Sequence, residues 1–401
     1  MKRAASTPGR CILLVMDSVG IGAAPDAGRY GDDGADTLGH IVAATPTLAL
    51  SNLAALGLGE AANEARGQAL PHGIGQTAET AAWAHALPQG APKGSTGGHW
   101  EIAGVPVERD WGYFGEDPDA PYPSALLDTL IAEAGLPGLI VVGRASGTAV
   151  IAEHGAAHCD TGRPIVYTSA DSVLQIAAHE RHFGLERLYG VCEIARRLCD
   201  DHRIARVIAR PFVGAGPADF QRTDNRRDFA IPPSAPTLLD ALCERGIRVT
   251  TFGKIGDLFA HRGIDTQYPA TGLNAVFDNL EGALAGGHGS GLFFANFCDF
   301  DSKYGHRCDV AGYADELARF DRRLGTFIYE LSPADLLIVT ADHGNDPTAP
   351  GSDHTRETVP VLLRGPGVVP GSHGRRASFC DIGATAAAFF GLTGLRGQPI
   401  D

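Results

Sequence analysis

Carboxylate and imidazole side chains follow several apolar runs of this chain, and they are the residues whose types could do chemistry. Six of them are candidate metal ligands: Asp17, Asp301, His306, Asp342, His343 and His354. Oxygen and nitrogen ligands of this kind suit Mn2+, Zn2+ or Mg2+, and the share of carboxylates favours Mn2+. Because six ligands exceed what one tetrahedral site uses, they predict a two-metal cluster that clamps the attacking and leaving oxygens of an in-line displacement.

Taken singly, each of these residues has an ordinary structural explanation. A single Asp after a strand is more often a helix cap or a turn residue, and a single His is more often a satisfied polar residue. The combination argues otherwise, because segment 340–346 (TADHGND) carries a buried strand into Asp-His-Gly and segment 352–355 (SDHT) adds a second His nearby. Packing does not explain such an arrangement, which favours a metal centre.

A phosphotransferase that uses such a cluster also needs an oxygen nucleophile. Segment 93–101 (KGSTGGHWE) offers Ser95 and Thr96 in a glycine-rich stretch. Small residues allow close approach of the backbone, and the residues that follow could start a helix whose N-terminal N–H groups face an anion. The alternative is a flexible Gly/Ser loop, and the spacing alone does not decide between the two.

Short apolar runs that are typical of strands buried on both faces position these residues. The strand candidates are 11–16 (CILLVM), 248–252 (RVTTF), 291–297 (GLFFANF), 335–340 (DLLIVT) and 359–363 (VPVLL). Helical segments at 48–58, 311–332 and 381–390 lie between them. Strands that alternate with helices predict an α/β fold with a doubly wound, mostly parallel sheet, whose sites lie at the carboxyl ends of the central strands.

The middle of the chain has a different composition. Pro and Gly are dense in 104–123 and again in 211–236, and a self-contained α/β stretch lies between them. A long insertion into a loop is tolerated because the entropy of closure grows slowly with length. We interpret this stretch as an inserted α/β cap domain, which gives a first core part at 1–107, the cap at 108–228 and a second core part at 229–401.

Composition limits the classes of partner and compartment. The 401 residues carry a net charge of −14, which argues against nucleic-acid binding. The eight cysteines form no CxxC pair and are typical of reduced core residues in a cytosolic protein. The first apolar run, 11–16, is too short for a signal peptide or for a membrane span of about 20 residues. We expect a cytoplasmic enzyme with a small-molecule substrate and neither a nucleic-acid nor a membrane partner, while the oligomeric state stays undetermined.

Several long motifs resemble those of bacterial phosphopentomutases, which belong to the alkaline phosphatase superfamily. The motifs are 15–26 (VMDSVGIGAAPD), 34–41 (GADTLGHI), 99–101 (HWE), 167–180 (YTSADSVLQIAAHE), 206–212 (RVIARPF), 253–255 (GKI), 299–301 (DFD), 305–307 (GHR) and 340–347 (TADHGNDP). They follow one another in order over nearly the whole chain. The resemblance implies an alkaline-phosphatase-like core with an inserted cap. It also implies an isomerase that interconverts ribose or deoxyribose 1-phosphate and 5-phosphate through a phosphoenzyme and a sugar bisphosphate.

The resemblance also implies roles for individual residues. One Mn2+ would be held by Asp17, Asp342 and His343, the other by Asp301, His306 and His354, and the nucleophile would bridge the two. The cap would read the sugar, with Ser169, Asp171 and Val173 near the ribose and with Arg206, Arg222 and the core residue Lys254 near the distal phosphate. Arg and Lys are natural phosphate partners, although a surface salt bridge is the alternative role for each. A sugar bisphosphate would be the activator that primes unphosphorylated enzyme.

One segment departs from the family pattern K-D-T-x-T-G-H-W-E. Gly94 stands for the Asp, Ser95 for the first Thr and Gly97 for the second. Ser95 keeps the hydroxyl of the family nucleophile, and Thr96 is the alternative if the loop shifts by one residue. The departure leaves open a phosphatase, a mutase paralogue that acts on another sugar phosphate, and a non-catalytic metal-binding relative. Segment 167–180 speaks against a phosphoglycerate mutase, because it resembles the pentose enzymes.

Overall fold

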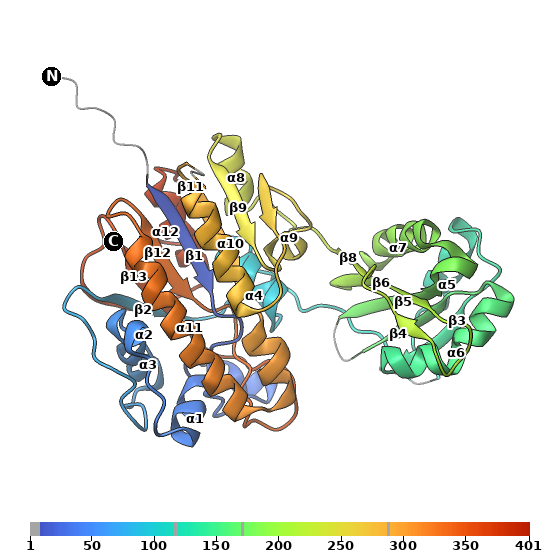
Figure 1. Ribbon diagram of the computed structural model, residues 1–401, viewed down its shortest axis with the longest axis horizontal. Coiled ribbons are helices and arrows are strands. Elements are labelled where there is room, and N and C mark those ends of the chain that lie inside the picture. The colour runs from blue at the N-terminus through green and yellow to red at the C-terminus, as the bar shows by residue number, and fades with distance from the viewer. Residues whose placement is uncertain (1–8, 116, 118, 170–171, 287–288) are drawn as a thin grey trace. The chain divides into compact units, whose positions relative to one another are not determined.

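The computed structural model describes residues 9–115, 117, 119–169, 172–286 and 289–401. The chain forms two compact units, which are drawn in Figure 1. The core unit combines Met1–Asp110 with Pro233–Asp401, and the cap unit is Trp111–Pro232. Asp171, which the resemblance places near the ribose, lies outside the described residues.

An eight-stranded sheet, counted over the described residues, forms the centre of the core unit, with the order β10-β9-β11-β1-β12-β13-β2-β14. Its strands are β1 (Arg10–Val15), β2 (Ala82–Ala86), β9 (Arg248–Phe252), β10 (Thr266–Tyr268), β11 (Gly291–Asn296), β12 (Leu336–Thr340), β13 (Val359–Arg364) and β14 (Gly371–Arg376). The neighbours from β10 to β12 are all parallel, whereas β13 runs antiparallel to both β12 and β2. The prediction of a mostly parallel α/β sheet is confirmed.

After Arg10, the central strand β1 is apolar, as its complete coverage by neighbouring elements requires. Cys11 to Val15 have no solvent exposure, and β1 pairs with β11 on one side and with β12 on the other. Val15 is in register with Asn296 of β11 and with Thr340 of β12. Because these parallel strands end at the same level, the residues that follow them meet at one edge of the sheet.

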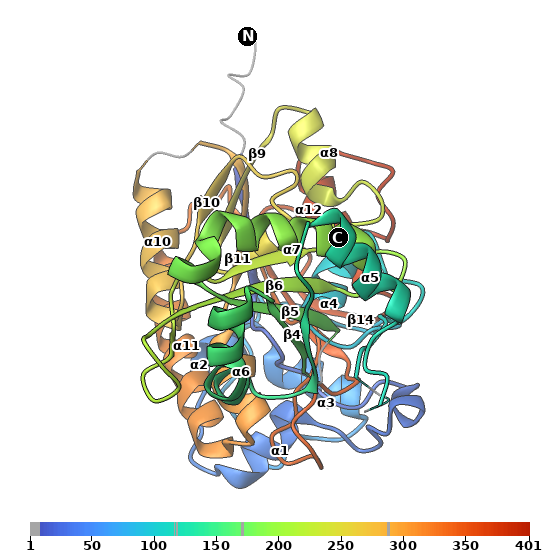
Figure 2. The same cartoon turned by 90° about the vertical axis from the view of Figure 1, so that its right-hand side faces the viewer.

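Helices cover both faces of the core sheet, as a doubly wound fold requires. The helices are α1 (Thr37–Ala44), α2 (Ser51–Ala55), α3 (Leu58–Arg66), α4 (Ser95–Ile102), α8 (Leu238–Glu244), α9 (Ile255–Leu258), α10 (Leu273–Ala285), α11 (Val310–Glu330) and α12 (Cys380–Phe389). Figure 2 shows α10 and α11 to one side of the sheet and α8 and α12 to the other. The apolar spacing of α11 explains its place, since Leu317, Phe320 and Leu324 are fully buried.

The prediction of one helix over 48–58 is wrong. The structure has two shorter helices, α2 and α3, which Gly57 separates. Gly57 has φ +102°, a left-handed conformation that glycine adopts readily and that ends a right-handed helix. A Cβ at this position would lie 2.8 Å from the Trp83 ring, so the close approach of β2 also favours glycine here.

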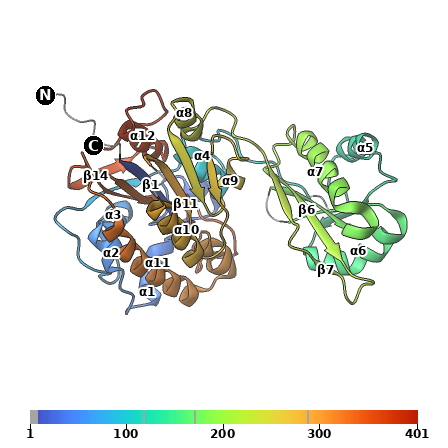
Figure 3. The same ribbon diagram turned by 45° about the horizontal axis from the view of Figure 1, so that its top comes forward.

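The cap unit has its own sheet and its own apolar clusters. The sheet order is β3-β4-β5-β6-β7, with β8 also paired to β6. The strands are β3 (Ile140–Arg144), β4 (Ile165–Thr168), β5 (Val173–His179), β6 (Arg206–Val213), β7 (Gln221–Arg222) and β8 (Arg227–Ala230), and the helices are α5 (Ser124–Glu133), α6 (Gly147–Thr161) and α7 (Leu185–Cys199). Helices α5 and α7 pack on one face with Val207, whereas α6 packs on the other with Phe212, as Figure 3 shows for α6 and α7.

Among the described residues of both units, every helix is too short or too polar to cross a lipid bilayer.

Candidate metal centre

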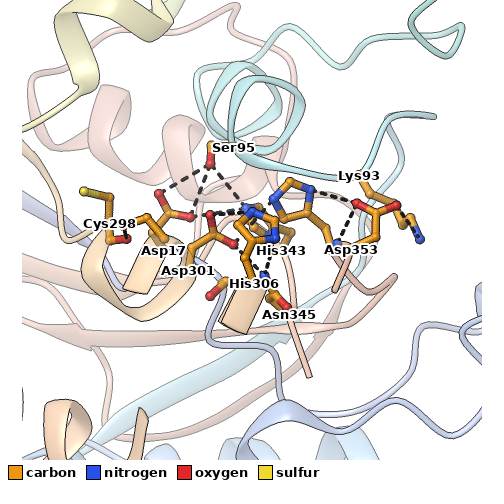
Figure 4. A network of polar contacts seen from close by, with 12 residues as sticks. Asp17, Lys93, Ser95, Cys298, Asp301, His306, His343, Asn345 and Asp353 are labelled. Atoms are coloured by element: carbon orange, nitrogen blue, oxygen red, sulfur yellow. Dashed lines mark hydrogen bonds and ion pairs between the residues drawn. The ribbon is translucent and has the colours of Figure 1, made fainter. Parts of the chain in front are cut away.

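The six ligands that the sequence predicts converge at the carboxyl edge of the core sheet. Asp17 follows β1, Asp342 and His343 follow β12, and Asp301 lies in a short helical turn, Phe300–Tyr304, after β11. His306 lies in the next turn, and His354 comes from the loop between β12 and β13. Figure 4 shows the labelled members of this set pointing toward one another beneath Ser95.

The first group consists of Asp17, Asp342 and His343, which are all buried. His343 Nε2 lies 3.2 Å from Asp17 Oδ1 and 3.5 Å from Asp342 Oδ2. His343 Nδ1 is 3.0 Å from the carbonyl oxygen of Gly344, which accepts a hydrogen bond from it. This bond orients the ring so that Nε2 faces the two carboxylates, the arrangement that a metal-binding histidine uses.

The second group surrounds Asp301. His354 Nε2 lies 3.4 Å from Asp301 Oδ1, and His306 Nε2 lies 3.2 Å from Asp301 Oδ2. Asn345 Nδ2 donates a 2.8 Å hydrogen bond to Asp301 Oδ1 and so holds the carboxylate in place. The His343 and His354 rings are in edge contact, with centroids 4.4 Å apart, which brings the two groups into one cluster.

The donor set of the cluster fits divalent cations. Asp342 Oδ2 is buried and accepts no well-formed hydrogen bond within the described part of the chain, although the charge of His99 lowers the pKa of this carboxyl. His99 Nδ1 lies 2.9 Å from this oxygen, but the nitrogen donates instead to the carbonyl oxygen of Ser95, also at 2.9 Å. A buried carboxylate oxygen without a donor carries a large energetic cost. A metal ion at this position would remove that cost.

Mutual attraction between acids and bases shifts the pKa values of the cluster. Burial alone would lower the pKa of His343, but Asp342 and Asp17 outweigh it and raise the pKa to about 10. Burial alone would also lower the pKa of His306, but the neighbouring Asp301 outweighs burial and raises this pKa to about 9. For Asp301 burial would raise the pKa, yet His354 and His306 hold it well below its usual range. The chain without metal therefore carries charged imidazoles among ionised carboxylates at neutral pH.

We expect uptake of Mn2+ to release protons. Metal ligation needs neutral imidazoles, so His343 and His306 must each lose a proton at pH 7, and the affinity should rise with pH until about 9 to 10. Calorimetric titrations in buffers of different ionisation enthalpy should count about two protons released at pH 7. His306→Gln should lower this count by about one, whereas His261→Gln, on an exposed histidine outside the cluster, should leave it unchanged. Uptake without proton release would contradict this electrostatic description.

The nucleophile segment begins a helix that points at the cluster. Ser95 is the first residue of α4, and its Oγ donates toward Asp17, with Oδ1 at 3.3 Å, and lies 3.4 Å from His343 Nε2. Thr96, the alternative nucleophile, follows on the same helix without a comparable contact among the described residues. The start of a helix offers N–H groups to an anion, so a phosphoryl group on Ser95 would be well placed.

Two glycines allow this helix to approach the ligands. A Cβ at Gly98 would lie 2.1 Å from the Asp342 carbonyl oxygen, and one at Gly94 would lie 2.7 Å from His354 Nδ1. Gly94 also has φ +100°. The Gly94 that departs from the family pattern therefore occupies a conformation and a space that suit glycine alone.

We expect Gly94→Ala to weaken metal binding at His354. Gly351 is a matched control, because it has φ +93° in the same loop as His354 but open space around its Cβ. Both alanine variants should lose about 1 kcal/mol of stability from backbone strain. Only Gly94→Ala displaces the His354 ring. The affinity of this variant for Mn2+ at the site that contains His354 should therefore fall roughly tenfold or more, as it does when other ligand positions are perturbed. Equal affinities of the two variants in a calorimetric titration would rule out this steric coupling.

The predicted substrate residues are divided between the units. Val173 of β5 is in register with Arg206 at the start of β6, and Arg206 pairs with Asp228 at 3.9 Å. Ser169 follows β4, and Arg222 lies on the short strand β7. These four belong to the cap unit. Lys254 belongs to the core unit and follows β9, where its charge acts on the thiol of Cys298, a residue that Figure 4 shows near Asp17 and Asp301.

Residues without a sequence-derived role support the ligands. Asn296, the last residue of β11, donates 2.9 Å from Nδ2 to Asp17 Oδ2 and lies 3.0 Å from His99 Nε2. Glu101 accepts hydrogen bonds from the backbone of Gly90 and Phe379, which ties α4 to its surroundings. The sequence motif HWE draws attention to His99 and Glu101. Sequence spacing alone does not predict that His99 contacts Asn296 or that Glu101 accepts hydrogen bonds from Gly90 and Phe379.

Comparison with known proteins finds relatives over nearly the whole chain. A profile described as Metalloenzyme superfamily matches residues 9–394. The phosphopentomutase of Methylobacterium nodulans is 54% identical over 398 residues, covering 96% of this chain and 97% of the relative. The phosphopentomutase of Yersinia pestis bv. Antiqua is 50% identical over 398 residues with the same two coverages, 96% and 97%. Among solved structures, Leishmania mexicana phosphoglycerate mutase is 14% identical with a TM-score of 0.47, covering 99% of this chain and 98% of that chain.

The sequence matches span nearly the full length of both partners, and the superfamily profile includes both the core and the cap unit. The candidate ligands are of the kind that a divalent metalloenzyme needs. The chain therefore belongs to the phosphopentomutase family within the metalloenzyme superfamily.

Proposed function

We propose that this chain interconverts ribose or deoxyribose 1-phosphate and 5-phosphate by passing a phosphoryl group through Ser95. The observation that carries the proposal is the position of Ser95 Oγ, at the first turn of α4 and within 3.4 Å of both Asp17 and His343. This oxygen faces the ligand cluster directly. A hydroxyl in such a place is suited to act as a nucleophile toward phosphorus.

The ligand cluster would hold two divalent cations, for which we propose Mn2+, with Mg2+ or Zn2+ as alternatives. Asp17, Asp342 and His343 would bind one, and Asp301, His306 and His354 the other. Bound cations would lower the pKa of the Ser95 hydroxyl and neutralise charge on the phosphoryl group. The protein's own contribution is the preorganised ligand set, held by Asn345 on Asp301 and by Asn296 on Asp17.

The proposed cycle starts from Ser95 that carries a phosphoryl group. A hydroxyl oxygen of the pentose phosphate attacks phosphorus and loses its proton, the Ser95 Oγ–P bond breaks, Ser95 Oγ takes up a proton, and the sugar becomes a 1,5-bisphosphate. The sugar then reorients, Ser95 Oγ attacks its other phosphorus, and the released sugar oxygen takes up a proton. The first-turn N–H groups of α4 would stabilise the phosphorylated serine. A sugar bisphosphate would supply the first phosphoryl group to unphosphorylated enzyme.

We propose specific residues for the recognition of the sugar phosphate. Ser169, Asp171 and Val173 would contact the ribose, and Arg206, Arg222 and Lys254 would contact the phosphate that is not being transferred. The pairing of Val173 with Arg206 across β5 and β6 supports a shared role for these two. All eight cysteines are free thiols, which supports work in the reducing cytoplasm.

A coupled assay tests the proposed function. Mn2+-loaded protein, ribose 5-phosphate and a trace of sugar bisphosphate should yield ribose 1-phosphate, and a chelator should stop the reaction. Release of inorganic phosphate without isomerisation would instead identify a phosphatase, to which the Gly94 departure could have led. If neither ribose 1-phosphate nor inorganic phosphate is formed, the proposal is contradicted.

A further inference from the structure

Glu357 carries a buried carboxyl group to which the proposed mechanism gives no role. It lies in the loop between β12 and β13, and only 1% of the residue is exposed. Burial raises its pKa to about 7, whereas hydrogen bonds from Thr355 and Thr37 lower it. Because burial of an ionised group costs free energy, the hydrogen-bond donors around this carboxyl decide whether it can keep its charge.

The four hydrogen bonds of the Glu357 carboxyl group within the described residues are all donated to it. Oε1 accepts from the hydroxyls of Thr37 at 2.6 Å and of Thr355 at 2.7 Å. Oε2 accepts from the backbone N–H groups of Thr37 at 3.0 Å and of Gly22 at 3.2 Å. An ionised carboxylate has acceptor sites alone, so it is the form that satisfies all four donors at once.

Both hydroxyl partners of Glu357 are fixed as donors by a second hydrogen bond. Thr37 Oγ1 accepts from the backbone N–H of Asn345 at 3.1 Å. Thr355 Oγ1 accepts from the backbone N–H of Asp346, also at 3.1 Å. Each hydroxyl therefore passes its own proton to Glu357, and the carboxylate joins the two threonines to the backbone of segment 345–346.

Two glycines make room for Glu357 beside the segments of the first metal group. A Cβ at Gly20 would lie 2.3 Å from Glu357 Oε2, and a Cβ at Gly344 would lie 2.3 Å from Oε1. Gly20 comes three residues after Asp17, and Gly344 directly follows His343. The carboxylate therefore packs between the two segments that carry these ligands, and glycine at both positions allows it to do so.

The Thr37 hydroxyl connects Glu357 with the second metal group. Asn345 donates its backbone N–H to Thr37 and its side-chain N–H to Asp301, the latter at 2.8 Å. The other hydroxyl partner of Glu357 directly follows His354 in the sequence. The contacts of one carboxylate thus reach segments that carry ligands of both metal groups.

We propose that the Glu357 carboxylate is a positioning residue that fixes the two metal groups relative to each other for phosphoryl transfer. It acts through the segments that carry the ligands rather than on an ion or a substrate. The proposal rests on the two-metal centre of the proposed function, in which two ions clamp the attacking and leaving oxygens. Groups that orient metal ligands contribute about 10- to 100-fold to metal affinity or activity.

Glu357→Gln tests this role, because an amide cannot accept hydrogen bonds on both sides. Its NH2 group opposes either the two backbone N–H groups or the two hydroxyl protons. In calorimetric titrations of the full-length chain, the Mn2+ affinity of both sites should fall about tenfold or more. At saturating Mn2+, kcat should fall by a similar factor while the KM for ribose 5-phosphate stays within about twofold. Because the titration needs no turnover, its result is independent of the identity of the nucleophile.

Asp321→Asn is the matched control for this variant. Asp321 is a buried carboxylate of α11 that accepts from the backbone N–H groups of Asn52 at 3.0 Å and of Leu53 at 2.8 Å. These partners lie on α2, which carries no candidate ligand. The control should lose stability but keep its Mn2+ affinity and its kcat. Unchanged Mn2+ affinity in Glu357→Gln, or equal losses of affinity in both variants, would overturn the proposal.

Thr37→Val makes a smaller change and decides the question if Glu357→Gln does not fold. Valine has a similar shape but no hydroxyl, so the bridge from Glu357 to Asn345 is lost, and the Mn2+ affinity of the site that contains Asp301 should fall several-fold. Thr385→Val is its control, because the buried Thr385 hydroxyl on α12 also donates one bond, at 2.6 Å, and accepts one, at 3.0 Å. Equal Mn2+ affinities in the two valine variants would contradict a positioning role.

Discussion

Ser95→Ala should lose mutase activity by at least about 10³-fold while it still binds two metal ions. The reason is that the substitution removes the only protein atom in the proposed cycle that forms a bond to phosphorus, and alanine offers no replacement. The ligands of the cluster stay in place, because Asp17 and His343 contact each other without help from Ser95. The measurement is the rate of ribose 1-phosphate formation, paired with metal analysis of the same sample.

Thr96→Ala is the matched control for this substitution. It removes the neighbouring hydroxyl from the same helix, and its activity should stay within a few-fold of the unmodified chain, since the contacts to Asp17 and His343 come from Ser95. If instead Thr96→Ala were inactive and Ser95→Ala active, the loop would have shifted by one residue in the working enzyme. Full activity in both variants would exclude a phosphoenzyme on this segment.

Asp301→Asn should reduce the bound metal from two ions to one and should abolish isomerisation. Asp301 is the shared partner of His306 and His354, so the second ion loses its central carboxylate. Loss of a residue that merely supports a ligand costs about 10- to 100-fold in metal affinity, and loss of the ligand itself should cost more than about 100-fold. Calorimetric titration with Mn2+ would report both the number of ions and the affinity.

Asp299→Asn provides the comparison for Asp301→Asn. Asp299 is another buried carboxylate of the same motif, but it pairs with Lys303 at 2.9 Å and accepts from the backbone of Leu273. We expect this variant to lose some stability and to keep both ions. Retention of two tightly bound ions in Asp301→Asn would contradict the assignment of the second metal group.

The sequence was informative where strands end in polar residues. Continuous apolar runs such as 11–16 are typical of strands buried on both faces, and the residue after each one falls at a common edge when the strands are parallel. The structure brings Asp17, Asp342 and Asp301 together in this way. The mostly parallel sheet and the family membership could be predicted for the same reason, because both depend on these motifs and their order.

The remaining features depend on contacts that no local pattern carries. Strand β14 (GSHGRR) is polar and half-exposed, so it has neither the apolar run nor the β-branched residues that mark a strand. Helix α2 is separated from α3 by only two residues, Leu56 and Gly57, and a periodic apolar pattern continues across them. His99 faces Asp342 across 243 positions of sequence only because Gly98 lets the helix approach. Arg210, Arg222 and Arg226 of the cap unit likewise come together from strands β6 and β7 and the loop 223–226.

The most direct test of the central claim is to identify the residue that carries the phosphoryl group. The Mn2+-loaded chain would be primed with a sugar bisphosphate, digested, and mapped by mass spectrometry. The proposed mechanism predicts one phosphoserine, at Ser95, that disappears when excess ribose 5-phosphate is added. Isomerisation by a chain that stays unphosphorylated at Ser95 throughout would contradict it.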